Sequence, residues 1–146
     1  MMHTWFECKV RYEKLGENGI TKKVTEPYLV DALSFTEAEA RIIEQVTPFI
    51  SGEFTVTAIA RAAYSETFFR DSGDRFFKCR IAFITLDEKS GKERKTKSNV
   101  LVQADTLQEA KDRLVESMKG TLADYSLEMV KETEIMDVYP YTPKEE

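Results

Sequence analysis

The chain has 146 residues, of which 42% are hydrophobic and 32% charged, with a net charge of −5 and a pI near 5.1. This length suffices for the core of a globular domain, and the composition excludes a disordered chain. The net negative charge gives no general attraction to phosphate or anionic lipid. No apolar run of about eighteen residues occurs, so we expect a cytoplasmic protein without a membrane segment.

The first elements in chain order are two predicted strands. Apolar and polar side chains alternate over residues 5–13, and a period of two is typical of a half-buried strand. The dipeptide Asn18-Gly19 predicts a hairpin turn, because both residue types tolerate a positive φ. A second strand is therefore expected to run to about Ala32.

A helix follows, and its start is marked by Ser34 with Glu37 three residues later, the pattern of a capping box. Apolar residues then recur at helical spacing, and we expect them to face a sheet: Phe35, Ala38, Ile42 and Val46. Further strands are expected from Phe54 and over residues 64–69. This part of the chain is therefore predicted to form a β-β-α-β-β unit.

The same pattern returns 71 to 72 residues later. Residues 5–12 match residues 76–83, and Thr106 with Glu109 repeats the capping box ahead of Leu107, Ala110, Leu114 and Met118. We predict an α+β fold made by tandem duplication of the β-β-α-β-β unit, with antiparallel sheets, one helix per copy and a pseudo-twofold axis. The copies are expected at 1–70 and 71–146, within one compact domain. Whether their sheets join edge to edge or pack face to face is left open.

Several long motifs carry a family resemblance. They read WFECKVRYEK, KKVTEPYLVDALSFTEAEARI, TPFISGEFTVTAI, FITLDEKSG and IMDVYPY. Together they resemble the family known as domain of unknown function 4494, over almost the whole chain. The resemblance implies a small bacterial protein of Bacteroidetes, their mobile elements or phages, and it implies no activity and no site residues.

The two cysteines, Cys8 and Cys79, occupy equivalent positions in the two copies. We expect buried thiols on inward strand faces. A disulfide across the pseudo-twofold axis is the alternative, which a cytoplasmic location disfavours. A metal site would need more ligands than these cysteines and His3 supply.

Catalytic motifs are absent from the sequence. His3 is the only histidine, so a serine or cysteine nucleophile has no evident base, and no phosphate-binding, dinucleotide-binding, H-E-x-x-H or C-x-x-C motif occurs. Asp31 is the one acid within an apolar strand, and Gln103 takes its place in the second copy. We therefore expect no enzyme, no cofactor and no metal.

One surface combines aromatic and basic residues. The predicted outward faces of the first strand in each copy carry Trp5, Lys9 and Arg11, then Phe76, Lys78 and Arg80. The hairpin over residues 89–97 adds Arg94, Lys95 and Lys97. Aromatic and basic side chains on a sheet are the components of a platform for single-stranded nucleic acid. Packing of the two aromatic rings, and protection of an edge strand by lysines, are the structural alternatives.

Two functions follow as hypotheses. The first is a non-enzymatic binding or adaptor protein whose partner is another protein or a second copy of this chain, since a sheet covered by helices on one face leaves the other face open. The second is a single-stranded nucleic-acid-binding protein using the strand faces and the basic hairpin.

Overall fold

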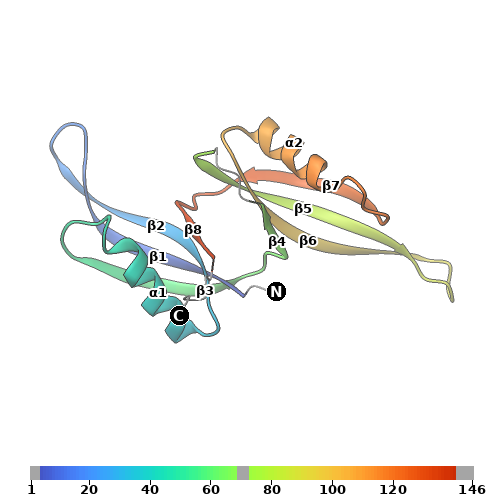
Figure 1. Cartoon of the computed structure of the whole chain (residues 1–146), viewed down its shortest axis with the longest axis horizontal. Helices are drawn as coiled ribbons and strands as arrows, with labels where there is room; N and C mark the ends of the chain where they lie inside the picture. Colours follow the sequence, from blue (N-terminus) through green and yellow to red (C-terminus); the bar gives the residue numbers. More distant parts are fainter. Residues whose placement is uncertain (1–3, 69–72, 141–146) are drawn as a thin grey trace, which may run out of the picture. The chain divides into compact units, whose positions relative to one another are not determined.

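The computed structural model describes residues 4–68 and 73–140, which form two α-helices and two four-stranded sheets (Figure 1). The predicted α+β class is confirmed. The chain divides into two compact units: the first consists of Met1–Ala63 and Glu134–Glu146, and the second of Tyr64–Thr133. These units differ from the predicted copies at 1–70 and 71–146, whose boundary lies outside the described residues, as does His3.

The first unit contains a sheet with strand order β3-β1-β2-β8. β1 pairs antiparallel with both β2 and β3, and β8 pairs in parallel with β2. Helix α1 packs against β1, β2 and β3, and its buried residues meet the side chains of Phe6, Cys8 and Val10. The elements are β1 (Trp5–Leu15), β2 (Thr21–Asp31), α1 (Phe35–Val46), β3 (Phe54–Ala62) and β8 (Val138–Tyr139).

The second unit contains a sheet with strand order β4-β6-β5-β7. β5 pairs antiparallel with β6 and β7, β4 pairs in parallel with β6, and α2 covers one face of the sheet. Its core joins Phe77, Cys79 and Ile81 to Ala110 and Leu114 of α2. The elements are β4 (Glu66–Phe68), β5 (Arg75–Leu86), β6 (Glu93–Ala104), α2 (Leu107–Ser117) and β7 (Asp124–Glu132).

The last strand of each predicted copy pairs with a strand that was predicted for the other copy. β4 follows β3 in sequence but pairs with β6, and β8 follows β7 but pairs with β2. Only residues 63–65 separate β3 from β4. Such a connection spans at most about 14 Å when fully extended. The position beside β2 that β8 occupies lies three strand spacings from β3, again about 14 Å. The connection is therefore too short to pass around β1 and β2 as well, so β4 does not complete the sheet to which β3 belongs.

The predicted helix starts are confirmed. The Ser34 side-chain oxygen accepts a hydrogen bond from the amide of Glu37, and that of Thr106 accepts one from the amide of Glu109, each at 3.1 Å. Each cap satisfies one amide that the first helical turn leaves without a partner. Within the described part of the chain, neither helix is long and apolar enough to cross a membrane.

Candidate functional site

The predicted platform on β1 is incomplete. Lys9 and Arg11 are exposed, as expected, but Trp5 is only 3% exposed. The expectation that Trp5 presents an open ring was therefore wrong. The alternation of the strand assigns the ring to the face opposite Phe6 and Cys8, but alternation does not predict whether that face is covered. A ring buried to this extent offers no surface on which a base could stack.

The equivalent part of β5 has the same arrangement. Phe76 is 4% exposed, which corrects the expectation that its ring is open, while Lys78 and Arg80 are half-buried. Neither strand therefore brings an exposed aromatic ring beside its basic residues. The structure leaves the predicted cations on these faces without the stacking partners that a nucleic-acid platform requires.

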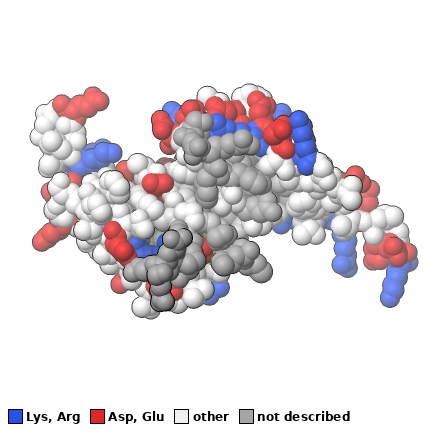
Figure 2. All heavy atoms as spheres, in the orientation of Figure 1, with Lys and Arg blue, Asp and Glu red and all other residues white. Residues whose placement is uncertain are grey.

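The basic hairpin between β5 and β6 lies at one end of its sheet. Arg94, Lys95 and Lys97 are exposed as expected, and the Lys97 Nζ lies 3.9 Å from a carboxylate oxygen of Glu128 on β7. Figure 2 shows acidic and basic atoms close together at this hairpin. The hairpin is therefore a surface of mixed charge, and its lysines also protect exposed strands from unwanted pairing.

Asp31 and Gln103 perform the same structural task in the two units. The Asp31 side chain accepts a hydrogen bond at 3.1 Å from the amide of Thr4, which precedes β1. The Gln103 side-chain amide donates at 2.7 Å to the carbonyl of Gly73, which precedes β5. Each side chain thus fixes the segment that enters the central strand, so the buried acid has a structural explanation.

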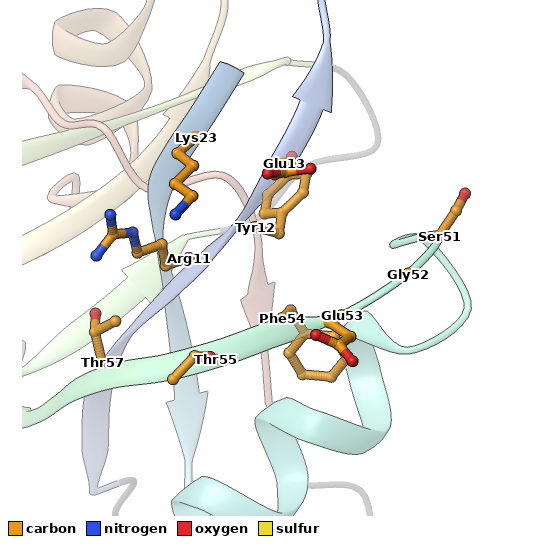
Figure 3. A pocket seen from close by; sticks show the side chains of 10 residues that line it. All are labelled: Arg11, Tyr12, Glu13, Lys23, Ser51, Gly52, Glu53, Phe54, Thr55 and Thr57. Carbon is orange, nitrogen blue, oxygen red and sulfur yellow. The ribbon is translucent and has the colours of Figure 1, made fainter. Parts of the chain in front are cut away.

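A cavity of about 530 Å³ lies at the start of β3 in the first unit (Figure 3). The side chains of Arg11 and Glu13 on β1 and Lys23 on β2 reach it from the sheet, and Glu53 reaches it from the loop before β3. Two of these side chains are positive and two are negative, so their net charge is zero. The remaining lining residues are Tyr12, Ser51, Gly52, Phe54, Thr55 and Thr57.

The chemistry of this cavity is limited by the state of its tyrosine. The Tyr12 hydroxyl donates a hydrogen bond to a carboxylate oxygen of Glu26. Burial and this carboxylate raise the pKa of Tyr12 above its usual range, so the phenol stays protonated. Arg11 is the one predicted site residue at the cavity, and nothing in its lining resembles a nucleophile paired with a base.

The cysteines are buried free thiols, one in each core, which confirms the expectation for Cys8 and Cys79. Burial raises the pKa of Cys8 to about 12, with a smaller contribution from Glu7, and burial raises that of Cys79 to about 11. Because the thiolate is the reactive form, both thiols are inert at neutral pH.

Each helix carries exposed apolar residues on one flank, a feature that sequence reasoning missed. Phe35 and Leu107 were expected in the core, yet they are 48% and 51% exposed. Ile43 and Val115 take equivalent positions two turns later and are 40% and 43% exposed. The signal was present in the sequence, because apolar residues recur at matched positions beside the core stripe of both helices.

These flanks face the long edge strands. In α1, an Arg41 nitrogen donates to the carbonyl of Asp31 on β2, which places the opposite flank on the side of β3. The Arg61 guanidinium of β3 lies 5.8 Å from the centre of the Phe35 ring, which confirms this placement. In α2, Arg113 donates at 2.6 Å to the carbonyl of Gln103 on β6, so the Leu107 flank lies on the side of β7.

The edge strands β3 and β7 differ in protection. Each has nine residues and ends its sheet, so one side of its backbone pairs with no strand among the residues the structure describes. β3 carries one charged residue, Arg61, whereas β7 carries Asp124, Glu128, Lys131 and Glu132. Charges on an edge strand oppose pairing with further strands, and β3 largely lacks them. We call Phe35, Ile43, Ile59 and Arg61 the α1–β3 surface.

The chain belongs to the family described as domain of unknown function DUF4494, whose family model matches residues 4–141. The expected family is thereby confirmed. Neither the comparison with curated proteins nor that with solved structures finds a match.

Proposed function

We propose that this chain is a non-enzymatic protein-binding module that takes up an extended segment of another protein at an edge strand. The observation that carries the proposal is the exposed apolar pair on each helix, Phe35 with Ile43 and Leu107 with Val115, beside an edge strand with an open side. Strand addition to such an edge satisfies the unpaired backbone groups, and neighbouring apolar side chains contribute specificity.

The proposal includes the origin of the two surfaces. We propose that the units arose by duplication of a β-β-α-β-β segment with pseudo-twofold symmetry, each exchanging its last strand. Matched caps at Ser34 and Thr106 and matched strand orders support this history. Two surfaces in one chain would let it connect two segments, as an adaptor does. The free thiols fit a reducing bacterial cytoplasm.

A peptide selection tests the proposal. A phage library of random twelve-residue peptides is selected on the immobilised chain and counter-screened against the double variant Ile43→Lys, Val115→Glu. Both positions are exposed, and each new charge has an oppositely charged residue four positions earlier on its helix, Glu39 and Lys111 respectively, so the helices are preserved.

We expect selected peptides with alternating apolar residues whose affinity falls at least about tenfold in the double variant, because each apolar contact contributes roughly 1–2 kcal/mol. Circular dichroism controls for folding. Failure to enrich any peptide, or equal affinity for the folded double variant, would contradict the proposal.

The nucleic-acid hypothesis is tested by titrating labelled single-stranded DNA at low salt, where electrostatic attraction is least screened. The burial of Trp5 and Phe76 favours a negative result. Binding that quenches Trp5 fluorescence and weakens in Arg94→Glu, Lys95→Glu would instead support a nucleic-acid function.

A further inference from the structure

Arg61 is a cation placed at the end of the α1–β3 surface. It lies across from Phe6 in the pairing of β1 with β3, and its guanidinium is 5.8 Å from the ring centres of both Phe6 and Phe35. Its side chain is exposed. Within residues 4–68 and 73–140, Arg61 has no ion-pair partner. The two rings hold the guanidinium beside the open edge of β3.

The equivalent position in the second unit has the opposite charge. Glu132 lies across from Phe77, as Arg61 lies across from Phe6. The Glu132 carboxylate is half-exposed and 3.5 Å from the Arg75 Nε, so its charge is partly compensated. β7 also carries Asp124 and Glu128 against a single Lys131. The two edges therefore present opposite signs at matched places.

We infer that the α1–β3 surface selects an extended apolar segment with an acidic side chain opposite Arg61, and that the α2–β7 edge disfavours the same segment. This inference rests on the proposed function and specifies the partner. Glu39 lies between Phe35 and Ile43 on the α1 flank, so the acid of the segment belongs at the Arg61 end only. The charge of Arg61 also excludes segments with a basic side chain at that position, because two like charges placed opposite each other weaken binding.

A second copy of this chain fits the edge less well than a foreign segment. The pairing of β1 with β3 contains a bulge between Lys9 and Val10, which leaves Thr57 as the extra residue near the middle of β3. Two β3 strands that paired about their centres would bring two bulges together and interrupt the ladder. If two copies of β3 instead paired antiparallel about the centre of the regular stretch from Ala58 to Ala62, their two Arg61 side chains would be diagonal neighbours across the paired strands.

The test uses two sets of labelled nine-residue peptides of alternating valine and serine. In one set a single Asp replaces each valine in turn, because Arg61 and the apolar residues of the α1–β3 surface share one face, and in the other a single Lys does so. Fluorescence anisotropy measures binding to the full chain and to Arg61→Glu, Arg61→Lys and Arg61→Gln. Arg61→Gln keeps much of the stem that covers the rings, and thermal unfolding controls for folding.

We expect one Asp peptide to bind best, with an affinity that falls about tenfold in Arg61→Glu and is retained in Arg61→Lys. The matched Lys peptide should gain affinity in Arg61→Glu. Equal binding of both sets to the wild type and to Arg61→Glu would overturn the inference while leaving strand addition intact. Absence of binding by every peptide would contradict the proposed function itself. A dimer in light scattering that Arg61→Glu strengthens would show that the occupant is a second copy, which also overturns the inference.

Discussion

Substitution of Val138 by alanine tests the parallel pairing of β8 with β2. Val138 is 8% exposed and lies opposite Leu29 in the parallel pair of β8 with β2. The substitution removes two methyl groups, worth about 0.8 kcal/mol each by transfer. Incomplete relaxation around the vacated space adds to this, so we expect a loss of about 2 kcal/mol in unfolding free energy. Val115→Ala, at a surface-exposed helix position, is the matched control and should cost less than about 0.5 kcal/mol.

Urea denaturation combined with native-state hydrogen exchange measures the effect and locates it. The Leu29 amide donates to the carbonyl of Asp137 at 3.1 Å, so its protection should fall in Val138→Ala. The Ser65 amide donates to the carbonyl of Asn99 at 2.9 Å in the second unit and serves as an internal control. Unchanged protection at Leu29, or a loss confined to the second unit, would show that β8 does not complete the first sheet.

Further experiments test the helix caps, the buried thiols and the close approach of Gly73 to the backbone of β6. Ser34→Ala and Thr106→Ala should each cost on the order of 1 kcal/mol in chemical denaturation, and no shift for either would contradict the observed caps. The folded pKa values of about 12 for Cys8 and about 11 for Cys79 lie above the unfolded value of 9.0. The folded state therefore favours the neutral thiols, and the stability that they contribute is complete below pH 9 and is lost as pH rises beyond it. Rapid reaction of native protein with a thiol reagent at pH 7 would contradict their burial. Gly73→Ala should cost on the order of 2 kcal/mol by denaturation, because φ is +136° and a Cβ would lie 2.9 Å from the backbone at the end of β6; an unchanged midpoint would refute this.

Local features of the fold were predictable from the sequence, and the pairing of β4 and β8 was not. Alternation over residues 5–13 predicted β1, which extends to Leu15, and the capping residues marked both helix starts. These signals depend on neighbours within a few residues. The partners of β4 and β8 depend instead on the reach of the connections before them, which no periodic pattern records.

The candidate site was predicted less well, because exposure depends on what covers a face. Trp5 was assigned to the correct strand and face, yet its ring is buried, while Phe35 was expected in the core and is half-exposed. Phe35 opens the first turn of α1, where the core stripe reaches the flank beside β3. Periodicity identifies such a stripe but does not give its lateral limits.

Hydrogen exchange of the full chain with a selected peptide bound tests the proposed function most directly. We predict that the peptide slows exchange of the outward amides of β3, between Phe54 and Ala62, because strand addition supplies their missing acceptors. Exchange in the 89–97 hairpin should not change. Slowed exchange at that hairpin, with β3 unaffected, would contradict the assignment of the edge strand as the binding site.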